Sequence, residues 1–155
     1  MFKIIESKIK SQGQLSYFKD SHEFISEPRI NSDTTILVGY IYIGFDSEYN
    51  ESTQIWGFHH DFNWKSSKLT PPKFIQGKII LNEDFINPGE SKRIGAANSW
   101  ETIYDESSGW LRFGGVNNSV ETSYVEFFPN TIMGIDENGE ITELWLCPTL
   151  KYLSE

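Results

Sequence analysis

The sequence predicts a mainly β fold, either all-β or α+β with little helix. Large aromatic residues make up 15% of the 155-residue chain, whereas alanine occurs only at Ala96 and Ala97. Alanine is the strongest helix former, while aromatic and β-branched side chains suit a pleated sheet. Short apolar runs also recur between turn-forming residues, which is typical of many short strands. We therefore expect an antiparallel sandwich, a strongly bent sheet or a barrel, with a C-terminal hairpin.

The N-terminal part of the chain alternates between apolar runs and polar segments. Strands are expected at residues 2–9, 14–18, 35–45 and 55–64. The run TILVGYIYIGF at 35–45 is apolar on both alternating faces, so it is interpreted as one central strand covered on both sides. The polar segments 20–34 and 46–53 are expected to be loops, the first with a short helical turn.

The C-terminal part contains the clearest local signal. Strands are expected at 74–81, within 92–100, at 110–116 and at 120–128, with a Gly- and Asn-rich turn between the last two. Pro71 and Pro72 exclude regular structure from the polar segment 64–73. Residues 131–146 are predicted to form a β-hairpin, because Asn138-Gly139 supplies the positive φ that a tight turn requires.

Length and composition suggest one domain covering residues 1–155, in the cytoplasm and away from membranes. Cys147 is the one cysteine and has no internal disulfide partner, which favours a reducing compartment. Glu6 and Lys8 interrupt the apolar N-terminal stretch, so no signal peptide is expected. No apolar run approaches the length of about 18 residues that suggests a membrane-spanning helix.

The net charge of −9 is concentrated near the C-terminus, because residues 101–155 carry a net charge of −8. An acidic excess is commonly a solvated surface that keeps a protein soluble. It also suits a basic partner. Direct binding to nucleic acid is disfavoured, because that function requires clustered Lys and Arg residues.

The segment IWGFHHDFNW at 55–64 holds the best candidates for chemistry. In an extended strand, alternate residues share a face. His60 would then lie in a row of aromatic side chains, and we expect it to be a core or groove histidine. His59 would point to the opposite side, together with Asp61. The two histidines would therefore not easily bind one metal ion.

Metal binding and catalysis are both disfavoured by what accompanies these residues. His59 and Asp61 could begin a metal site, but a structural zinc site needs about four ligands and a catalytic one about three. The remaining histidine and cysteine, His22 and Cys147, lie far away in the sequence, and Cys147 is in an apolar run that suggests a buried, inert thiol. We expect no metal, no cofactor and no enzymatic activity. An enzyme that uses His59, His60 and Asp61 is an alternative.

The aromatic residues allow a second function. Aromatic faces bind sugars and other rings, so the chain could be a small-molecule or carbohydrate-binding domain. Its pocket would be lined by Tyr40, Trp56, Phe58 and His60. The competing interpretation is that these side chains fill the core of the sheets, where large aromatic groups contribute much buried area.

The C-terminal segment NTIMGIDENGEITELWL, in a short acidic chain, resembles immunity proteins of bacterial contact-dependent growth inhibition and related polymorphic toxin systems. The resemblance implies a protein that binds and neutralises a cognate toxin, often a basic nuclease, without catalysis. It transfers no functional residue, because these proteins share a role and no common motif.

The acidic side chains of the C-terminal third are the candidates for such an interface. The residues expected to bind a basic partner are Glu101, Asp105, Glu106, Glu121, Asp136, Glu137, Glu140 and Glu143. Their charge would steer a basic nuclease toward the protein, and the bound protein could then cover the active site of the nuclease. Addition of a partner strand to a sheet edge is an alternative binding mode. The oligomeric state is left open.

Overall fold

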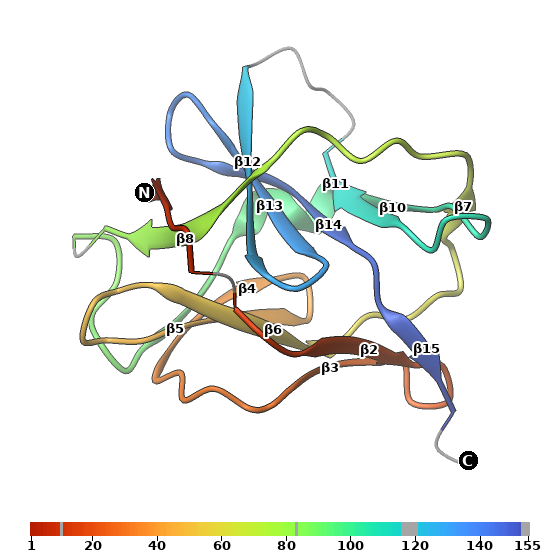
Figure 1. Cartoon of the computed structure of the whole chain (residues 1–155), viewed down its shortest axis with the longest axis horizontal. Coiled ribbons are helices and arrows are strands. Elements are labelled where there is room, and N and C mark those ends of the chain that lie inside the picture. Colours follow the sequence, from red (N-terminus) through yellow and green to blue (C-terminus); the bar gives the residue numbers. More distant parts are fainter. Residues whose placement is uncertain (10, 83, 116–120, 153–155) are drawn as a thin grey trace.

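Two β-sheets pack face to face in the computed structural model, which describes residues 1–9, 11–82, 84–115 and 121–152 (Figure 1). The first sheet has the strand order β1 (Phe2–Glu6), β8 (Ile75–Leu81), β12 (Thr122–Phe128), β13 (Thr131–Asp136), β14 (Ile141–Leu146), β11 (Leu111–Gly114), β10 (Glu101–Tyr104) and β7 (Lys65–Ser66). The second sheet has the order β15 (Thr149–Lys151), β2 (Gln14–Phe18), β3 (Glu23–Glu27), β6 (Ser52–Phe58), β5 (Ile41–Phe45), β4 (Thr34–Val38) and β9 (Ser91–Arg93).

This architecture confirms the predicted mainly β fold and is that of a sandwich. Each sheet has two edge strands, so within the described residues neither sheet closes on itself. A short 3-10 helix, η1 (Gly95–Ser99), accompanies the strands. Most neighbouring strands are antiparallel, as expected. Four described pairs are parallel, namely β7–β10, β8–β12, β2–β15 and β4–β9, so both sheets are mixed.

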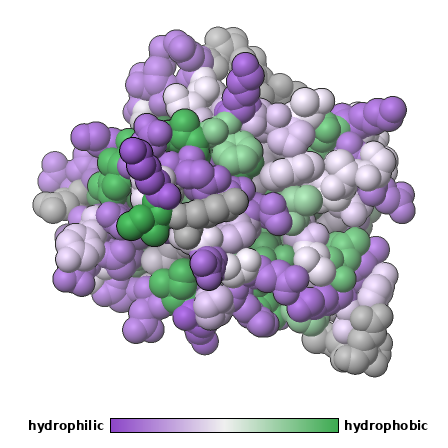
Figure 2. Space-filling model, viewed as in Figure 1, coloured by the Kyte–Doolittle hydropathy of each residue, from purple (hydrophilic) through white to green (hydrophobic). Residues whose placement is uncertain are grey.

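The core lies between the two sheets and is formed by alternate side chains of facing strands. The second sheet contributes fully buried residues such as Ile36, Phe45 and Ile55, and the first contributes Leu111 and Leu144. Complete burial of such a side chain contributes about 1.5–3 kcal/mol, so the inner faces supply much of the stability. Figure 2 shows hydrophilic side chains over most of one side of the molecule, with hydrophobic ones in scattered patches.

Residues 35–45 form two strands, so the prediction of one central strand is wrong. Gly39, with a φ of 59°, makes a tight turn, and Val38 pairs with Ile41 across the resulting hairpin. Inward-facing residues have even numbers in β4 and odd numbers in β5. This change of parity at the turn explains why the run is apolar on both faces when it is treated as one strand.

The segment 20–34 contains β3, so the prediction of a loop is also wrong. Phe24 and Ser26 face inward, and the Ser26 hydroxyl donates a hydrogen bond of 2.7 Å to the carbonyl of Ile55. The alternation is hidden in the sequence because one inward-facing residue is polar. The short strands β7 and β10 were not predicted either, and β6 begins at Ser52, within the segment expected to be a loop.

The predicted C-terminal hairpin is confirmed. Strands β13 and β14 pair in antiparallel register, and Gly139 has a φ of 76° at the turn. The expected turn before residue 120 falls at 116–120, outside the described residues. Among the helices of the described ranges, none has the length and apolar character needed to cross a membrane.

Candidate functional site

Five of the eight candidate partner-binding acids lie toward one end of the first sheet. They are Glu101 at the start of β10, Glu121 before β12, and Asp136, Glu137 and Glu140 at the turn between β13 and β14. The register places Glu101 level with Glu143, and it places Glu121 and the hairpin turn about three residues (~10 Å) farther toward the same end. At about 4.8 Å per strand the row extends over roughly 20 Å. We call these five residues the acidic rim.

The hairpin turn holds the central part of the acidic rim in one conformation. The Asp136 carboxylate accepts hydrogen bonds from the backbone N–H groups of Asn138 (2.9 Å) and Glu140 (3.0 Å). Asp136 is therefore half-buried and occupied, whereas the side chains of Glu137 and Glu140 are exposed. The turn thus presents exposed carboxylates on an ordered backbone.

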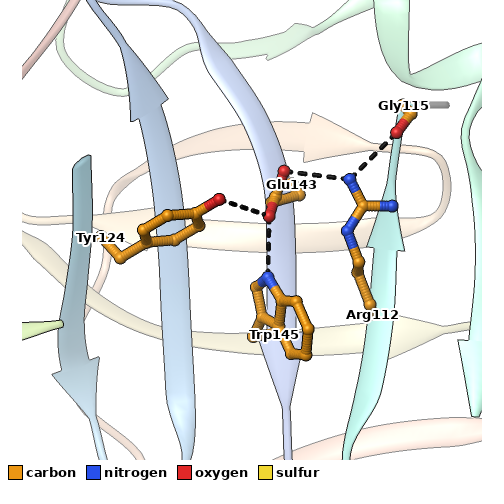
Figure 3. Close-up of polar contacts among 5 residues, drawn as sticks. All are labelled: Arg112, Gly115, Tyr124, Glu143 and Trp145. Atoms are coloured by element: carbon orange, nitrogen blue, oxygen red, sulfur yellow. Dashed lines mark hydrogen bonds and ion pairs between the residues drawn. The ribbon is translucent and has the colours of Figure 1, made fainter. Parts of the chain in front are cut away.

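Glu143 does not belong to the partner-facing surface, although it is one of the expected residues. Its side chain is only 1% exposed. Figure 3 shows Arg112 and the side chains of Tyr124 and Trp145 converging on its carboxylate. The ion pair with Arg112 measures 3.0 Å, and the hydrogen bonds from Tyr124 and Trp145 measure 2.8 Å each. A carboxylate with these partners is occupied inside the protein.

Two glycines make room for Glu143 on the outer face of the first sheet. A Cβ atom at Gly114 would lie 2.5 Å from the Glu143 Cβ, and one at Gly134 would lie 3.1 Å from its Cγ. These positions flank Glu143 on β11 and β13. Burial and the hydrogen bond to Glu143 raise the pKa of Tyr124 to about 12, so the phenol stays protonated and donates.

Asp105 and Glu106 lie in the turn after β10, at the opposite end of the strands from the acidic rim. Asp105 is buried and accepts hydrogen bonds from the backbone N–H of Leu69 (2.9 Å) and the hydroxyl of Ser107 (2.6 Å). These bonds hold the pKa of Asp105 well below its usual range. Asp105 therefore anchors the segment around Leu69, while Glu106 is exposed but remote from the other acids.

The segment 55–64 is a strand only as far as Phe58, and this changes the environments expected for its histidines. Beyond Phe58 the chain turns, and the backbone N–H of His59 donates to the carbonyl of His22 at 2.7 Å. His60 is exposed and stacks on Phe62 with ring centroids 5.2 Å apart, so of its two expected places the core is wrong, whereas His60 does line a cleft. The more buried member of the pair is His59.

His59 lies among aromatic rings and is neutral at physiological pH. Its ring is 4.6 Å from that of Phe113 and 5.7 Å from that of Trp64, and its Nε2 shares a hydrogen bond of 2.9 Å with the Thr102 hydroxyl. Burial, and secondarily the charge of His60, lowers the pKa of His59 to about 4. It therefore serves as an uncharged hydrogen-bonding group.

Asp61 is near His22, and the expected pairing of Asp61 with His59 on one face does not occur. His22 Nδ1 lies 3.4 Å from the Asp61 carboxylate, without the alignment of a hydrogen bond. Within the described residues, no three His, Cys, Asp or Glu side chains gather in a way that would hold a metal ion. Cys147 is half-buried rather than fully buried, and burial raises the pKa of its thiol.

A cleft of about 700 Å³ opens between the two sheets. Its wall comes from the β4–β5 turn, the segment after β6, strands β7, β9, β10 and β11, and η1. We call it the interlayer cleft; its lining residues are Gly39, Tyr40, His59, His60, Asn63, Lys65, Arg93, Ala97, Asn98, Trp100, Glu101, Thr102 and Phe113.

The interlayer cleft contains half of the aromatic pocket expected from the sequence. Tyr40 and His60 line it, whereas Trp56 and Phe58 do not. Trp56 instead stacks on Tyr42 with ring centroids 5.7 Å apart, and Phe58 is 55% exposed. No sequence pattern assigns Arg93, Asn98 or Trp100 to a pocket, because the segments that line the cleft meet only in the folded chain.

A search with models of protein families found no match to this chain, and no curated protein matches its sequence. The resemblance to immunity proteins therefore stays a prediction. The function must be argued from the acidic rim and the interlayer cleft.

Proposed function

We propose that this protein is an immunity-type inhibitor that binds a basic toxin domain, of the nuclease kind, through the acidic rim. The observation that carries the proposal is that five acidic residues from three segments of the chain gather toward one end of the first sheet. Arg112 forms an ion pair with the buried Glu143, and Lys65 forms one with Glu101 at one end of the rim. The N-terminal amino group of Met1 lies beside Gly139 of the hairpin turn, and the acids Glu121, Glu137 and Glu140 still leave the described centre of the rim with a net negative charge.

Long-range electrostatics support this function. A nuclease domain carries positive charge to hold phosphate, and a net charge of −9 attracts such a surface before contact. Interfacial charge pairs that come close together contribute about 1.5–7 kcal/mol in double-mutant cycles. The exposed rim carboxylates would form these pairs, and an inhibitor seated on the basic surface would exclude the nucleic acid.

The edges of the sheets support the rim over strand addition as the binding mode. In the described parts of the chain the sheets have four edge strands, and three of them are very short, since β7 has two residues and β9 and β15 have three each. Short edges limit the number of backbone hydrogen bonds that a partner strand can make. Only β1, with five residues, offers a longer edge.

Growth rescue tests this proposal. The C-terminal domain of the protein encoded immediately upstream is expressed in a bacterial host, with and without the full chain. We expect the domain to arrest growth and the chain to restore it. The variant Glu121→Lys/Glu137→Lys/Glu140→Lys should rescue growth poorly, because it reverses charges at the acidic rim and leaves Asp136 in its turn.

The matched control is Glu27→Lys/Glu48→Lys/Glu106→Lys, which changes the net charge equally at exposed acids away from the rim. The control should rescue growth like the unmodified chain. An upstream domain that does not arrest growth, or equal rescue by the two triple variants, would contradict the proposal.

A further inference from the structure

The interlayer cleft has the size and chemistry of a ligand site and shares only Glu101 with the acidic rim. Small-molecule sites in proteins have volumes of about 300–1,000 Å³, and the cleft of about 700 Å³ falls within this range. Its floor is closed by the buried residues Ala97, Thr102 and Phe113. A ligand would therefore enter between the sheets and meet a packed, preformed surface.

The cleft carries a local excess of positive charge in an acidic protein. Arg93 and Lys65 line it, opposed by Glu101 alone among its carboxylates. The Lys65–Glu101 ion pair of 3.0 Å is solvent-exposed, with side chains 63% and 44% exposed, and such pairs exchange easily with a ligand. Two cations at the mouth of a cleft favour an anionic ligand.

Arg93 is held in place for such an anion. Its Nη1 donates a hydrogen bond to the carbonyl of Gly39, and the guanidinium lies 5.6 Å from the centre of the Tyr40 ring. These contacts reduce the freedom that the side chain would lose on binding. The planar guanidinium binds carboxylate and phosphate groups through paired N–H donors.

Aromatic and amide groups provide the remaining contacts. Tyr40 is 67% exposed, and Trp100 is held edge-on against Phe113 with ring centroids 5.2 Å apart. Their faces suit the C–H surface of a sugar ring. The amides of Asn63 and Asn98, both exposed at the cleft, offer donors and acceptors for hydroxyl groups.

We infer that the interlayer cleft binds a small anionic sugar, with Arg93 and Lys65 on its acidic group and Tyr40 and Trp100 against its ring. The acidic group is a carboxylate, as in a uronic acid, or a phosphate, as in a sugar phosphate. The binding is reversible and requires no covalent step.

NMR titration of the ¹⁵N-labelled full chain tests this inference with glucuronate, glucose 6-phosphate, glucose and AMP. We expect at least one of the two sugar anions to shift the indole N–H of Trp100 and the backbone N–H of Asn98, and glucose to bind at least about tenfold more weakly, since hydrogen bonds to charged groups contribute about 1.5–3 kcal/mol. The responding anion identifies the carboxylate or the phosphate as the acidic group.

Variants locate the site. Arg93→Gln should weaken binding of the sugar anion by about tenfold or more, and Tyr40→Ala by about two- to tenfold. Lys92→Gln is the matched control, because Lys92 neighbours Arg93 but contacts Phe85 outside the cleft, with its Nζ 4.1 Å from the ring centre. Its affinity should stay within about twofold of the unmodified chain, since isolated surface charges contribute little.

Three results would overturn the inference. The first is no response to either sugar anion at about 10 mM, where binding would contribute only about −3 kcal/mol. The second is a response to AMP alone, which would assign the ring to a base. The third is equal loss of affinity in Arg93→Gln and Lys92→Gln. The triple variant of the acidic rim leaves all of these cleft residues unchanged, so failure of one proposal is distinguishable from failure of the other.

Discussion

His59 is the residue whose environment makes the stability of the protein depend on pH. It lies at the junction of the sheets, where Thr102 of β10 shares its hydrogen bond and the rings of Phe24 and Trp64 surround it. Its neutral form suits this setting, because charging an imidazole among aromatic side chains removes the hydration of the ion. The same burial makes His59 a source of acid sensitivity.

The pH dependence of stability should reveal this group. The pKa of His59 is about 4 in the folded chain and has an ordinary value of 6.5. The unfolded chain therefore takes up a proton as the pH falls below about 6.5, while the folded chain resists until about pH 4, so stability is lost through this window by up to about 3 kcal/mol. Urea unfolding from pH 7 to pH 4 measures the loss.

Two variants isolate the contribution of His59. His59→Gln should show a shallower fall of the unfolding free energy than the unmodified chain, because it has no imidazole to protonate. His60→Gln, which removes an exposed neighbour, should keep most of the steep fall. Parallel pH profiles for His59→Gln and the unmodified chain would show that His59 is not protected from protonation.

Glu143 connects three strands on the outer face of the first sheet. Tyr124 of β12 and Arg112 of β11 both bind its carboxylate on β14. Glu143→Gln should lower the unfolding free energy by about 3–5 kcal/mol, because it leaves the Arg112 charge buried without a counter-ion. Urea unfolding of the two proteins at neutral pH measures the difference.

The exposed Lys65–Glu101 pair provides the comparison for Glu143. It has the same separation of 3.0 Å as the Arg112–Glu143 pair. Because its side chains are exposed, Glu101→Gln should cost less than about 1 kcal/mol. If the two substitutions destabilise the protein equally, burial does not explain the contribution of the Arg112–Glu143 pair to the free energy of unfolding.

The sequence predicts individual strands well where the apolar alternation is regular and turn-forming residues mark both ends of the strand. Strands β2 and β8 and the β13–β14 hairpin were anticipated within a residue or two. Strand β3 was missed because inward-facing Ser26 interrupts the apolar alternation. The sequence predicts one strand over residues 35–45, because inward-facing residues change from even to odd numbers at Gly39 and the run therefore looks apolar on both faces.

In the folded protein, the position of the acidic surface is partly predictable from the sequence, whereas the residues that meet at the cleft are not. The acidic C-terminal third does contribute the acidic rim. Its sequence does not distinguish the exposed carboxylates from Glu143, which is buried by groups on other strands, or from Asp105, which is bonded to the segment around Leu69. The interlayer cleft joins residues from both sheets, so only Tyr40 and His60 were anticipated. Long-range pairing decides both features.

Calorimetric titration of the full chain with the domain encoded immediately upstream tests the proposal that the acidic rim binds a basic partner. The unmodified chain should bind, and its affinity should fall with added salt. Glu121→Lys/Glu137→Lys/Glu140→Lys should weaken binding by about a hundredfold and flatten the salt dependence, because reversed charges repel the partner. Glu27→Lys/Glu48→Lys/Glu106→Lys should weaken it less than about threefold, since distant exposed charges are screened. Equal affinities for the two triple variants, or binding that does not respond to salt, would contradict the claim.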